Sequence, residues 1–230
     1  MKNLLAVSIA VLLMAASASA GPYFADNFND GVLDSAHWQS GGDGITEADG
    51  MLHMVRDGAG DYLRTVNTYS GDFRIDLDIR LNSIVWNDMF HGISLVNDVG
   101  HYGYGVSFGF AKYGKLYRAQ HSGNSTSYSY GPVGSNNQYT WQHWTLEKIG
   151  SHLSILVDGA PVPAGWGNQW LEGTVPENLR ISLPGLYNDG GSGGATSSDV
   201  DNFSIAVVPE PTSLLLLTAA TAGLLRRRRS

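Results

Sequence analysis

The sequence predicts an all-β domain built as a sandwich or a barrel. From residue 72 to residue 81, polar and apolar side chains alternate without a break. One face of this strand should therefore meet a core and the other water. Shorter alternating runs recur along the chain between turn-forming pairs such as Asp57-Gly58 and Asp158-Gly159. No stretch between residues 21 and 208 keeps a 3.6-residue period, so we expect little helix.

Further strands are expected wherever short apolar or alternating runs lie between turn residues. They cover residues 51–55, 62–66, 92–96, 102–110, 116–120, 144–149, 153–157, 179–183 and 200–207. The strand at 102–110 has Tyr, Val and Phe at its even positions and mainly Gly and Ser at its odd ones. Such bare backbone permits close approach by a neighbouring segment or by a sugar ring.

The N-terminus has the pattern of a secretory signal peptide. Residues 1–20 carry one early positive charge, Lys2, then an apolar core, and end in Ala18-Ser19-Ala20. Small residues at this spacing are what a signal peptidase requires. We expect cleavage after Ala20 and export of residues 21–208 as one domain, which is long enough to bury a core.

The C-terminus, residues 209–230, combines Pro209-Glu210-Pro211, an uncharged run at 212–225 and the cluster Arg226, Arg227, Arg228, Arg229. The run of 14 residues spans about 21 Å as a helix, against about 30 Å for a hydrocarbon core. It suits transient insertion in the inner membrane, with the arginines at the cytoplasmic interface. The three parts together resemble the PEP-CTERM sorting signal of Gram-negative bacteria. The resemblance implies recognition by an exosortase, cleavage near Pro209 and delivery to the cell surface or extracellular matrix, including biofilm.

Charge and cysteine content restrict the possible partners. Loss of Lys2 and the four terminal arginines leaves 9 of 14 Lys and Arg, and loss of Glu210 leaves 20 of 21 Asp and Glu. The exported domain is therefore near −11, which disfavours nucleic acid and anionic lipid surfaces. The chain has no cysteine, so disulfides, thiolate metal sites and cysteine nucleophiles are excluded.

Three segments resemble the concanavalin A-like (laminin G-like) jelly rolls. Residues 26–38 are similar to the opening strand and turn, residues 141–162 to the signature hairpin that ends in Val-Asp-Gly, and residues 199–205 to the closing strand. The resemblance implies a two-sheet antiparallel jelly-roll sandwich. It also implies a concave face of the kind that often binds or cuts polysaccharide, although a fold alone does not fix a function.

Carboxylates arranged for catalysis are not evident in the sequence. Glycoside hydrolases that this fold resembles carry two or three acidic residues on one strand. Here the nearest match is Asp76 and Asp78, which are flanked by Arg74 and Arg80. These cations favour ionised aspartates, whereas a general acid needs a raised pKa. We expect a charge-paired, solvated strand face and no catalytic residues.

Calcium is the one cofactor that the sequence suggests. Jelly rolls that this chain resembles often hold one structural Ca²⁺ where the first and last strands meet. The resemblance nominates Asp26 and Asp201 first, with Asp30 and Asp199 beside them. Carboxylate and carbonyl oxygens are the ligands calcium prefers. The alternative is that these are ordinary acidic turn residues.

Aromatic residues in polar loops are the candidates for glycan binding. A Trp or Tyr ring offers an apolar face to the C–H side of a sugar. The candidates, with polar neighbours included, are Trp166, Trp170, Asn168, Trp86 and Tyr128. For Trp166 and Trp170, loop packing is an equal alternative. Trp38, Trp141 and Trp144 are expected in the core.

The sequence therefore predicts an exported surface or matrix protein that binds or organises polysaccharide without catalysis. One alternative is a glycoside hydrolase or lyase with a divergent site on the same fold. It would require two carboxyl groups facing each other across the groove, without cationic neighbours. A second alternative is a ligand-free structural matrix protein, which would have no aromatic patch.

Overall fold

A computed structural model defines the fold. It describes residues 22–56, 62–83, 91–97, 104–111, 115–122, 125–130, 139–162, 177–183 and 196–208. The expected signal peptide and the apolar C-terminal run lie outside these residues. The described part of the chain is all strand and turn, and it has no helix of the length and apolar character that a membrane crossing needs.

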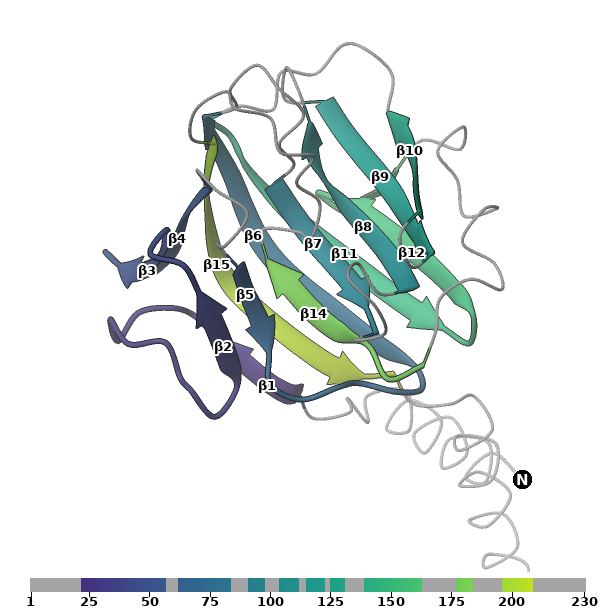
Figure 1. Ribbon diagram of the computed structural model, residues 1–230, viewed down its shortest axis with the longest axis horizontal. Helices are drawn as coiled ribbons and strands as arrows, with labels where there is room; N and C mark the ends of the chain where they lie inside the picture. The colour runs from purple at the N-terminus through teal and green to yellow at the C-terminus, as the bar shows by residue number, and fades with distance from the viewer. Residues whose placement is uncertain are drawn as a thin grey trace, which may run out of the picture.

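The described strands form two antiparallel sheets that lie one over the other (Figure 1). Sheet A has the order β13 (Ala160–Pro161), β12 (His152–Val157), β11 (Trp141–Ile149), β6 (Phe73–Ser83), β15 (Thr196–Val207), β4 (Met51–Arg56) and β3 (Ile45–Ala48), and β1 (Pro22–Asp26) also pairs with β15. Sheet B has the order β10 (Ser125–Tyr130), β9 (Lys115–Ser122), β8 (Tyr104–Ala111), β7 (His91–Val96), β14 (Arg180–Leu183), β5 (Tyr62–Thr65) and β2 (Trp38–Gly41). The predicted all-β sandwich is confirmed.

Each strand expected from the alternation is present, but five described strands were not expected from it. They are β1, which pairs with β15, and β2, β3, β10 and β13, each of which ends a sheet. A strand at the end of a sheet has a partner on one side only and buries few apolar side chains. Its sequence therefore lacks the alternation that identifies a central strand.

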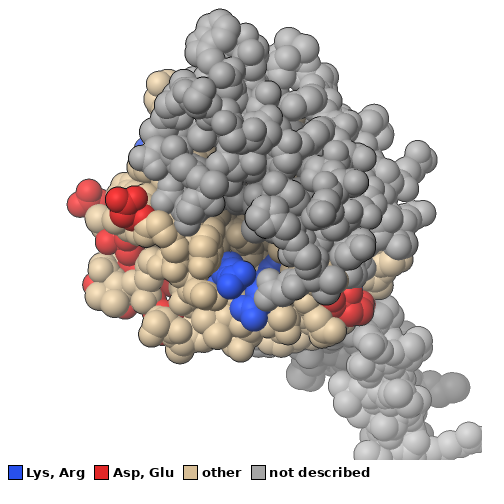
Figure 2. Space-filling model, viewed as in Figure 1, with Lys and Arg blue, Asp and Glu red and all other residues tan. Residues whose placement is uncertain are grey.

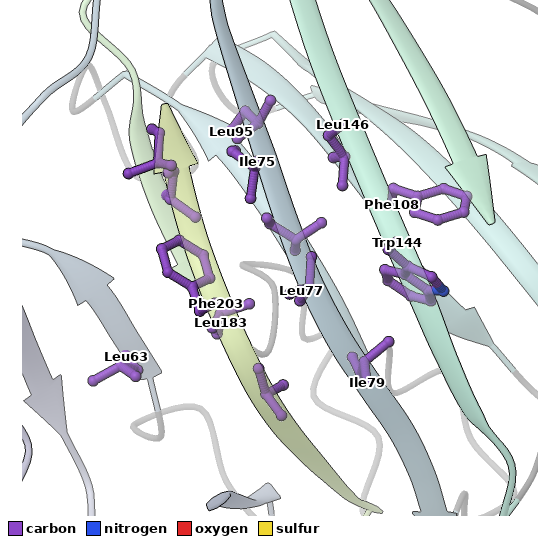
Figure 3. Packing of buried hydrophobic residues seen from close by; sticks show 14 of the residues in the cluster. Leu63, Ile75, Leu77, Ile79, Leu95, Phe108, Trp144, Leu146, Leu183 and Phe203 are labelled. Atoms are coloured by element: carbon purple, nitrogen blue, oxygen red, sulfur yellow. The ribbon is translucent and has the colours of Figure 1, made fainter. Parts of the chain in front are cut away.

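The core lies between the sheets and is centred on β6. Five apolar side chains of this strand, at every second position from Phe73 to Leu81, have no exposed surface. Trp144 of β11 is equally buried, and its ring lies 4.7 Å from Phe108 and 4.9 Å from Phe110, both on β8 (centroid distances). Figure 3 shows Trp144 beside Phe108, with Ile75, Leu77 and Ile79 of β6 in the same core. Burial on this scale is the main force holding the sandwich together.

The first and last strands of the domain lie side by side, as the resemblance to jelly rolls implied. β1 pairs with β15, with Phe24 opposite Ile205. Trp38 packs against both Phe24 and Phe203, at centroid distances of 5.3 and 5.0 Å. The buried indole also donates from Nε1 to Asp26 Oδ2 at 2.8 Å, so its polar atom is satisfied.

The signature hairpin is present, with one correction. β11 pairs with β12 from Trp144 opposite Val157 to Ile149 opposite His152. Trp141, however, is not a core residue, because 37% of it is exposed. Trp141 and Trp144 are three residues apart, and a strand of period two places such positions on opposite faces.

Candidate functional site

The outer face of sheet B, which is turned away from the core, carries a polar row across the sheet. We call this register row the central row. Strand pairing links Gln39, Arg64, Ser182, Ser94, Ser107, Ala119 and Tyr128 in that order. Paired residues of adjacent strands lie side by side on the same face. Segments distant in sequence thus place an amide, a guanidinium and three hydroxyl groups in one line.

At the β2–β5 end of the row, aromatic and polar side chains lie together at the surface. Arg64 Nε donates to Gln39 Oε1 at 3.1 Å, and Arg64 Cζ lies 5.2 Å from the centre of the Tyr62 ring. The Tyr62 ring covers Gly41, where a Cβ atom would overlap the ring. Gln39 is exposed and Tyr62 and Arg64 are partly so, which leaves this group open to a ligand.

In the middle of the row is a buried hydroxyl group without a hydrogen-bond partner. Ser182 is 1% exposed, and its Oγ makes no hydrogen bond. The next two residues of the row do pair, Ser94 Oγ to Ser107 Oγ at 2.5 Å. A buried polar group left unpaired costs about 1–3 kcal/mol. Among the described side chains of the central row, only Gln39 and Arg64 are more than slightly exposed.

Arg180 lies on the same face, two residues before Ser182. Its Nη1 donates to the carbonyl oxygens of Thr65 and Val66, at 3.0 and 2.7 Å. These bonds fix the guanidinium beside β5. Figure 2 shows Lys and Arg side chains gathered where β5 and β14 run in Figure 1, with the described acidic side chains nearer the edges of this face.

The glycines of this face are explained by the sheet itself. A Cβ atom at Gly105 would overlap the carbonyl oxygen of Leu95, and one at Gly92 would overlap that of Phe108. Both carbonyls belong to the neighbouring strand of the β7–β8 pair. For the bare strand at 102–110, close approach by a neighbouring segment is therefore confirmed at Gly105.

Sheet B contains no Asp or Glu in any of its described strands. A retaining or inverting glycosidase needs two carboxyl groups flanking the scissile bond. The described strands supply neither of them on the face that carries the central row.

The acidic side chains of the described strands are on sheet A, and three of them, Asp76, Asp78 and Asp199, lie in ion pairs. Asp76 receives two hydrogen bonds from Arg74, at 2.7 and 2.8 Å, and one from Thr145 Oγ1 at 2.6 Å. Burial raises the pKa of Asp76, but these bonds and the charge of Arg74 outweigh it, and the pKa lies below its usual value. The expected charge-paired face is confirmed here, because a carboxyl so held stays ionised.

His143 joins the second aspartate to the first. Its Nδ1 lies 2.7 Å from Asp78 Oδ1, and its Nε2 lies 3.4 Å from Asp76 Oδ1. Asn202 Nδ2 donates to the other oxygen of Asp78 at 2.9 Å. His143 itself is exposed.

Arg80 pairs with Asp199 and not with the aspartates of its own strand. Its Nη2 and Nε donate to Asp199 Oδ2 at 2.5 and 3.2 Å, and His53 Nδ1 lies 2.8 Å from Oδ1. Burial raises the pKa of Asp199, which is 2% exposed. The hydrogen bonds from Arg80, Asn82 and His53 lower the pKa by more than burial raises it, so that it lies below its usual value.

The four residues predicted to bind calcium, Asp26, Asp30, Asp199 and Asp201, do not come together at one site. No three Asp, Glu or His side chains of the described residues are placed to share a metal ion. Asp199 is held by Arg80 and His53, and Asp26 accepts from Phe28 N and from the Trp38 indole. These contacts do not fit a site built from all four. A smaller site from Asp26, Asp201 and backbone carbonyls stays a prediction.

Asp30 lies instead beside a different carboxylate. Glu47 Oε1 accepts the N–H groups of Asp30 and Gly31 at 3.0 and 2.8 Å. Burial, with the nearby Asp30 carboxyl, raises the pKa of Glu47. The contact ties the turn after β1 to β3.

Most of the nominated ligand residues lie outside the described part of the chain. These are Trp86, Trp166, Asn168 and Trp170. Tyr128 is placed by strand pairing on the central row, although its side chain is not described. The polar members of that row, Gln39, Arg64, Ser94 and Ser182, were missed in the sequence because nothing local marks them.

Comparison with known proteins bears on both parts of the chain. Residues 207–229 match the model of the PEP-CTERM protein-sorting motif. Among curated protein sequences, none matches this chain.

Solved structures show the same fold at low identity. One was reported with the endo-acting O-glycanases that human gut bacteria express to initiate mucin breakdown; it has 17% identity and a TM-score of 0.61, and the match covers 82% of this chain and 100% of that one. Rv0315 of Mycobacterium tuberculosis, described as a pseudo β-1,3-glucanase, has 16% identity and a TM-score of 0.57 over 82% and 100% of the chains. The cellulose-induced protein Cip1 has 15% identity and a TM-score of 0.56 over 80% and 97%. Identities this low establish the fold alone.

The motif indicates export and implies processing by an exosortase-type sorting enzyme. This chain is thus an exported protein that joins a concanavalin A-like β-sandwich to a PEP-CTERM sorting motif.

Proposed function

We propose that this exported protein binds polysaccharide on the outer face of sheet B without cleaving it. It would act at the cell surface or in the extracellular matrix of a Gram-negative bacterium. The observation that carries the proposal is the surface group of Tyr62, Arg64 and Gln39 at the β2–β5 end of the central row. Sugars are recognised by such a combination of polar groups and an aromatic ring.

The lack of Asp and Glu in the described strands of sheet B supports binding without catalysis. The paired Asp76 on sheet A supports the same conclusion, since its lowered pKa makes it a poor general acid. A solved structure of the same fold, described as a pseudo β-1,3-glucanase, supports the non-catalytic part of the proposal.

The test is binding of the purified full chain to a broad glycan array, with and without calcium. Tyr62→Ala and Gln39→Ala should weaken the hits, and so should Trp166→Ala or Trp170→Ala if those loops contribute. Trp141→Ala is the matched control, because it removes an exposed aromatic side chain from the outer face of sheet A.

A blank array in both conditions would favour the ligand-free structural role. Release of reducing sugar from any bound glycan would favour a divergent hydrolase. Dependence of the hits on calcium, lost in Asp26→Asn and Asp201→Asn, would support the smaller metal site.

A further inference from the structure

We infer that, before the sorting motif is processed, one end of the sandwich rests on the outer surface of the inner membrane through Tyr23, Ile149 and Val207. The partner is a lipid bilayer surface, and the end in contact with it is the one at which β15 finishes. This inference goes beyond polysaccharide binding and does not rest on it. It comes from the place at which the sorting motif joins the sheet.

The sorting motif begins inside the last strand. The matched residues are 207–229, and β15 ends at Val207. Val207 still pairs with Phe73 of β6, and the N–H of Val208 donates to Asp72 O at 3.0 Å. Only residues 209–211 then separate the sheet from the apolar run at 212–225. The junction is thus three residues long, and two of the three are proline, which restricts the backbone.

Chain length limits how far the sheet can lie from the bilayer. The four steps from Val208 to residue 212 span at most about 14 Å when fully extended, and the headgroup layer on each side of a bilayer is itself about 5–8 Å thick. The apolar run, about 21 Å long as a helix, is about 9 Å shorter than the hydrocarbon core. With the arginines at the cytoplasmic interface, this difference pulls the junction inward or thins the bilayer around it. Either way, Val208 lies close to the headgroup layer.

Three strands bring exposed apolar side chains to the end of sheet A beside this junction. Phe73 of β6 pairs with β15 at Val207 on one side and, on the other, with the residue of β11 that precedes Ile149. β1 begins at the same end, since its first residue pairs with the residue before Val207, and Tyr23 is its second residue. In Figure 1, the end of β15 and the start of β6 lie at the lower edge of the sandwich.

The side chains at this end suit the headgroup region. Tyr23 is 46% exposed, Ile149 39% and Val207 37%. Tyrosine is enriched at membrane–water interfaces, where its ring contacts apolar chains and its hydroxyl group stays among polar groups. The Tyr23 ring is supported from within the domain by Tyr69, at a centroid distance of 5.2 Å. Aliphatic side chains such as Ile149 gain free energy when they leave water.

Carboxylates in the turns at this end are held within the domain. Asp72 Oδ1 accepts the N–H of Gly150 at 2.6 Å. Glu177 accepts the N–H of Gly71 at 2.9 Å and a hydrogen bond from Lys148 Nζ at 2.9 Å. Since carboxylates repel anionic headgroups, the partner is a bilayer surface in which zwitterionic lipid predominates.

The test uses single fluorophores on the exported precursor, which keeps residues 209–230 when it is purified from cells without a sorting enzyme. The chain has no cysteine, so one introduced thiol is the only site of labelling. Ser151→Cys places the label at the end beside the junction, and Thr140→Cys places it at the opposite end of β11; both residues are exposed. The nine residues of β11 separate the two labels by about 30 Å.

The labelled precursor is reconstituted into vesicles of phosphatidylethanolamine and phosphatidylcholine that contain a lipid with a spin-labelled headgroup as quencher. We expect quenching at Ser151→Cys to be at least about threefold that at Thr140→Cys, because the second label lies about 30 Å farther out. A linker of about 20 Gly and Ser residues between Val208 and Pro209 has a mean span of about 25 Å. It should lower the quenching at Ser151→Cys to the level at Thr140→Cys.

Substitutions test the apolar contact itself. Tyr23→Ser combined with Ile149→Ser should lower the quenching at Ser151→Cys about twofold, because the end loses its interfacial side chains. Tyr139→Ser is the matched control, since it removes a tyrosine that is 70% exposed and precedes β11 at the opposite end. It should leave the quenching unchanged. Thermal transitions verify that each variant is folded.

Equal quenching at the two labels would overturn the inference, and so would failure of the precursor to associate with the vesicles. Quenching that persists in full with the inserted linker would show that the short junction does not seat the domain, which also overturns it. Equal effects of the Tyr23 and Ile149 substitutions and of Tyr139→Ser would overturn the assignment of the contact to these side chains. The glycan array measures the proposed function separately, and none of these outcomes changes its result.

Discussion

The Arg80 guanidinium lies 4.8 Å from the centre of the Trp141 ring while it donates two hydrogen bonds to Asp199. The ion pair holds the cation over the indole. This arrangement accounts for a large aromatic residue on the outer face of sheet A, where 37% of it is exposed. Two tryptophans of one strand therefore have opposite roles.

Substitution should separate those roles. Trp144→Ala empties the centre of the core and should lower the free energy of unfolding by about 3–5 kcal/mol. Trp141→Ala removes a partly exposed ring and one cation–π contact, so the loss should stay near about 1 kcal/mol. Urea denaturation of both variants measures the difference. Comparable losses would contradict the placement of Trp141 on the outer face.

A buried lysine connects β11 to two turns. Lys148 has no exposed surface, and its Nζ donates to Gly71 O at 3.0 Å and to Glu177 Oε1 at 2.9 Å. Lys148→Ala removes the packed stem and leaves the carbonyl unpaired, so we expect a loss of about 2–4 kcal/mol in unfolding free energy. Denaturant titration at neutral pH is the measurement.

Two further variants apportion that loss. Lys148→Met keeps the stem and should lose only about 1–2 kcal/mol. Glu177→Gln should cost less than about 1 kcal/mol, because the Glu177 side chain is 55% exposed and an exposed ion pair contributes little. A larger loss in Glu177→Gln than in Lys148→Ala would show that the ion pair, and not burial, is the main contribution.

The central features of the fold could be predicted from the sequence because they depend on local patterns of residues. β6 alternates over its full length, and Asp158-Gly159 adopts the positive φ angles, 51° and 75°, of a tight turn before β13. The edge strands could not be predicted, since a strand with few buried apolar side chains has only a weak alternating pattern. The exposure of Trp141 was recoverable from its three-residue spacing to Trp144.

Much less of the candidate site could be predicted from the sequence. Ser182 and Arg64 become neighbours only through the pairing of β14 with β5. No spacing in the sequence predicts that register, because it is fixed by packing across the whole sheet. The local indications of a binding face were single aromatic residues in loops and the bare positions of residues 102–110, which include Ser107; the other polar residues of the central row had none.

Acid should weaken the fold through two carboxylates of sheet A. The pKa values of Asp76 and Asp199 lie below 3.8 in the folded protein. A carboxyl whose pKa is lowered by folding stabilises the protein above its unfolded pKa, and this contribution is lost as pH falls through the folded value. Stability should therefore decline as pH falls below about 4, which urea denaturation between neutral and acidic pH would measure.

Asp199→Asn should lower stability at neutral pH and flatten the acid-side decline. Asp43→Asn, in an exposed turn, is the control and should follow the unmodified protein at every pH. An unchanged acid-side slope in Asp199→Asn would show that this residue does not contribute to it.

The glycine at position 105 should be required for the β7–β8 pairing. Alanine there would place Cβ against Leu95 O, a backbone atom that cannot move without shifting the strand. We expect Gly105→Ala to lower the melting temperature or to prevent folding. Ser107→Ala, two positions along the same face, tests the strand without this overlap and should be milder. Equal effects would show that β8 is not closely approached at Gly105.

The sorting motif can be tested apart from the sandwich. Replacing Pro209, Glu210 and Pro211 with alanine should block processing in cells that hold an exosortase-type enzyme, since the motif matched at 207–229 would lose its recognition element. The uncleaved chain should then stay in the inner membrane, with the arginine cluster at the cytoplasmic side. Thr218→Ala, a small change within the apolar run, is the control. Fractionation and immunoblotting would show the result, and normal release of the alanine variant would mean that this tripeptide does not direct processing.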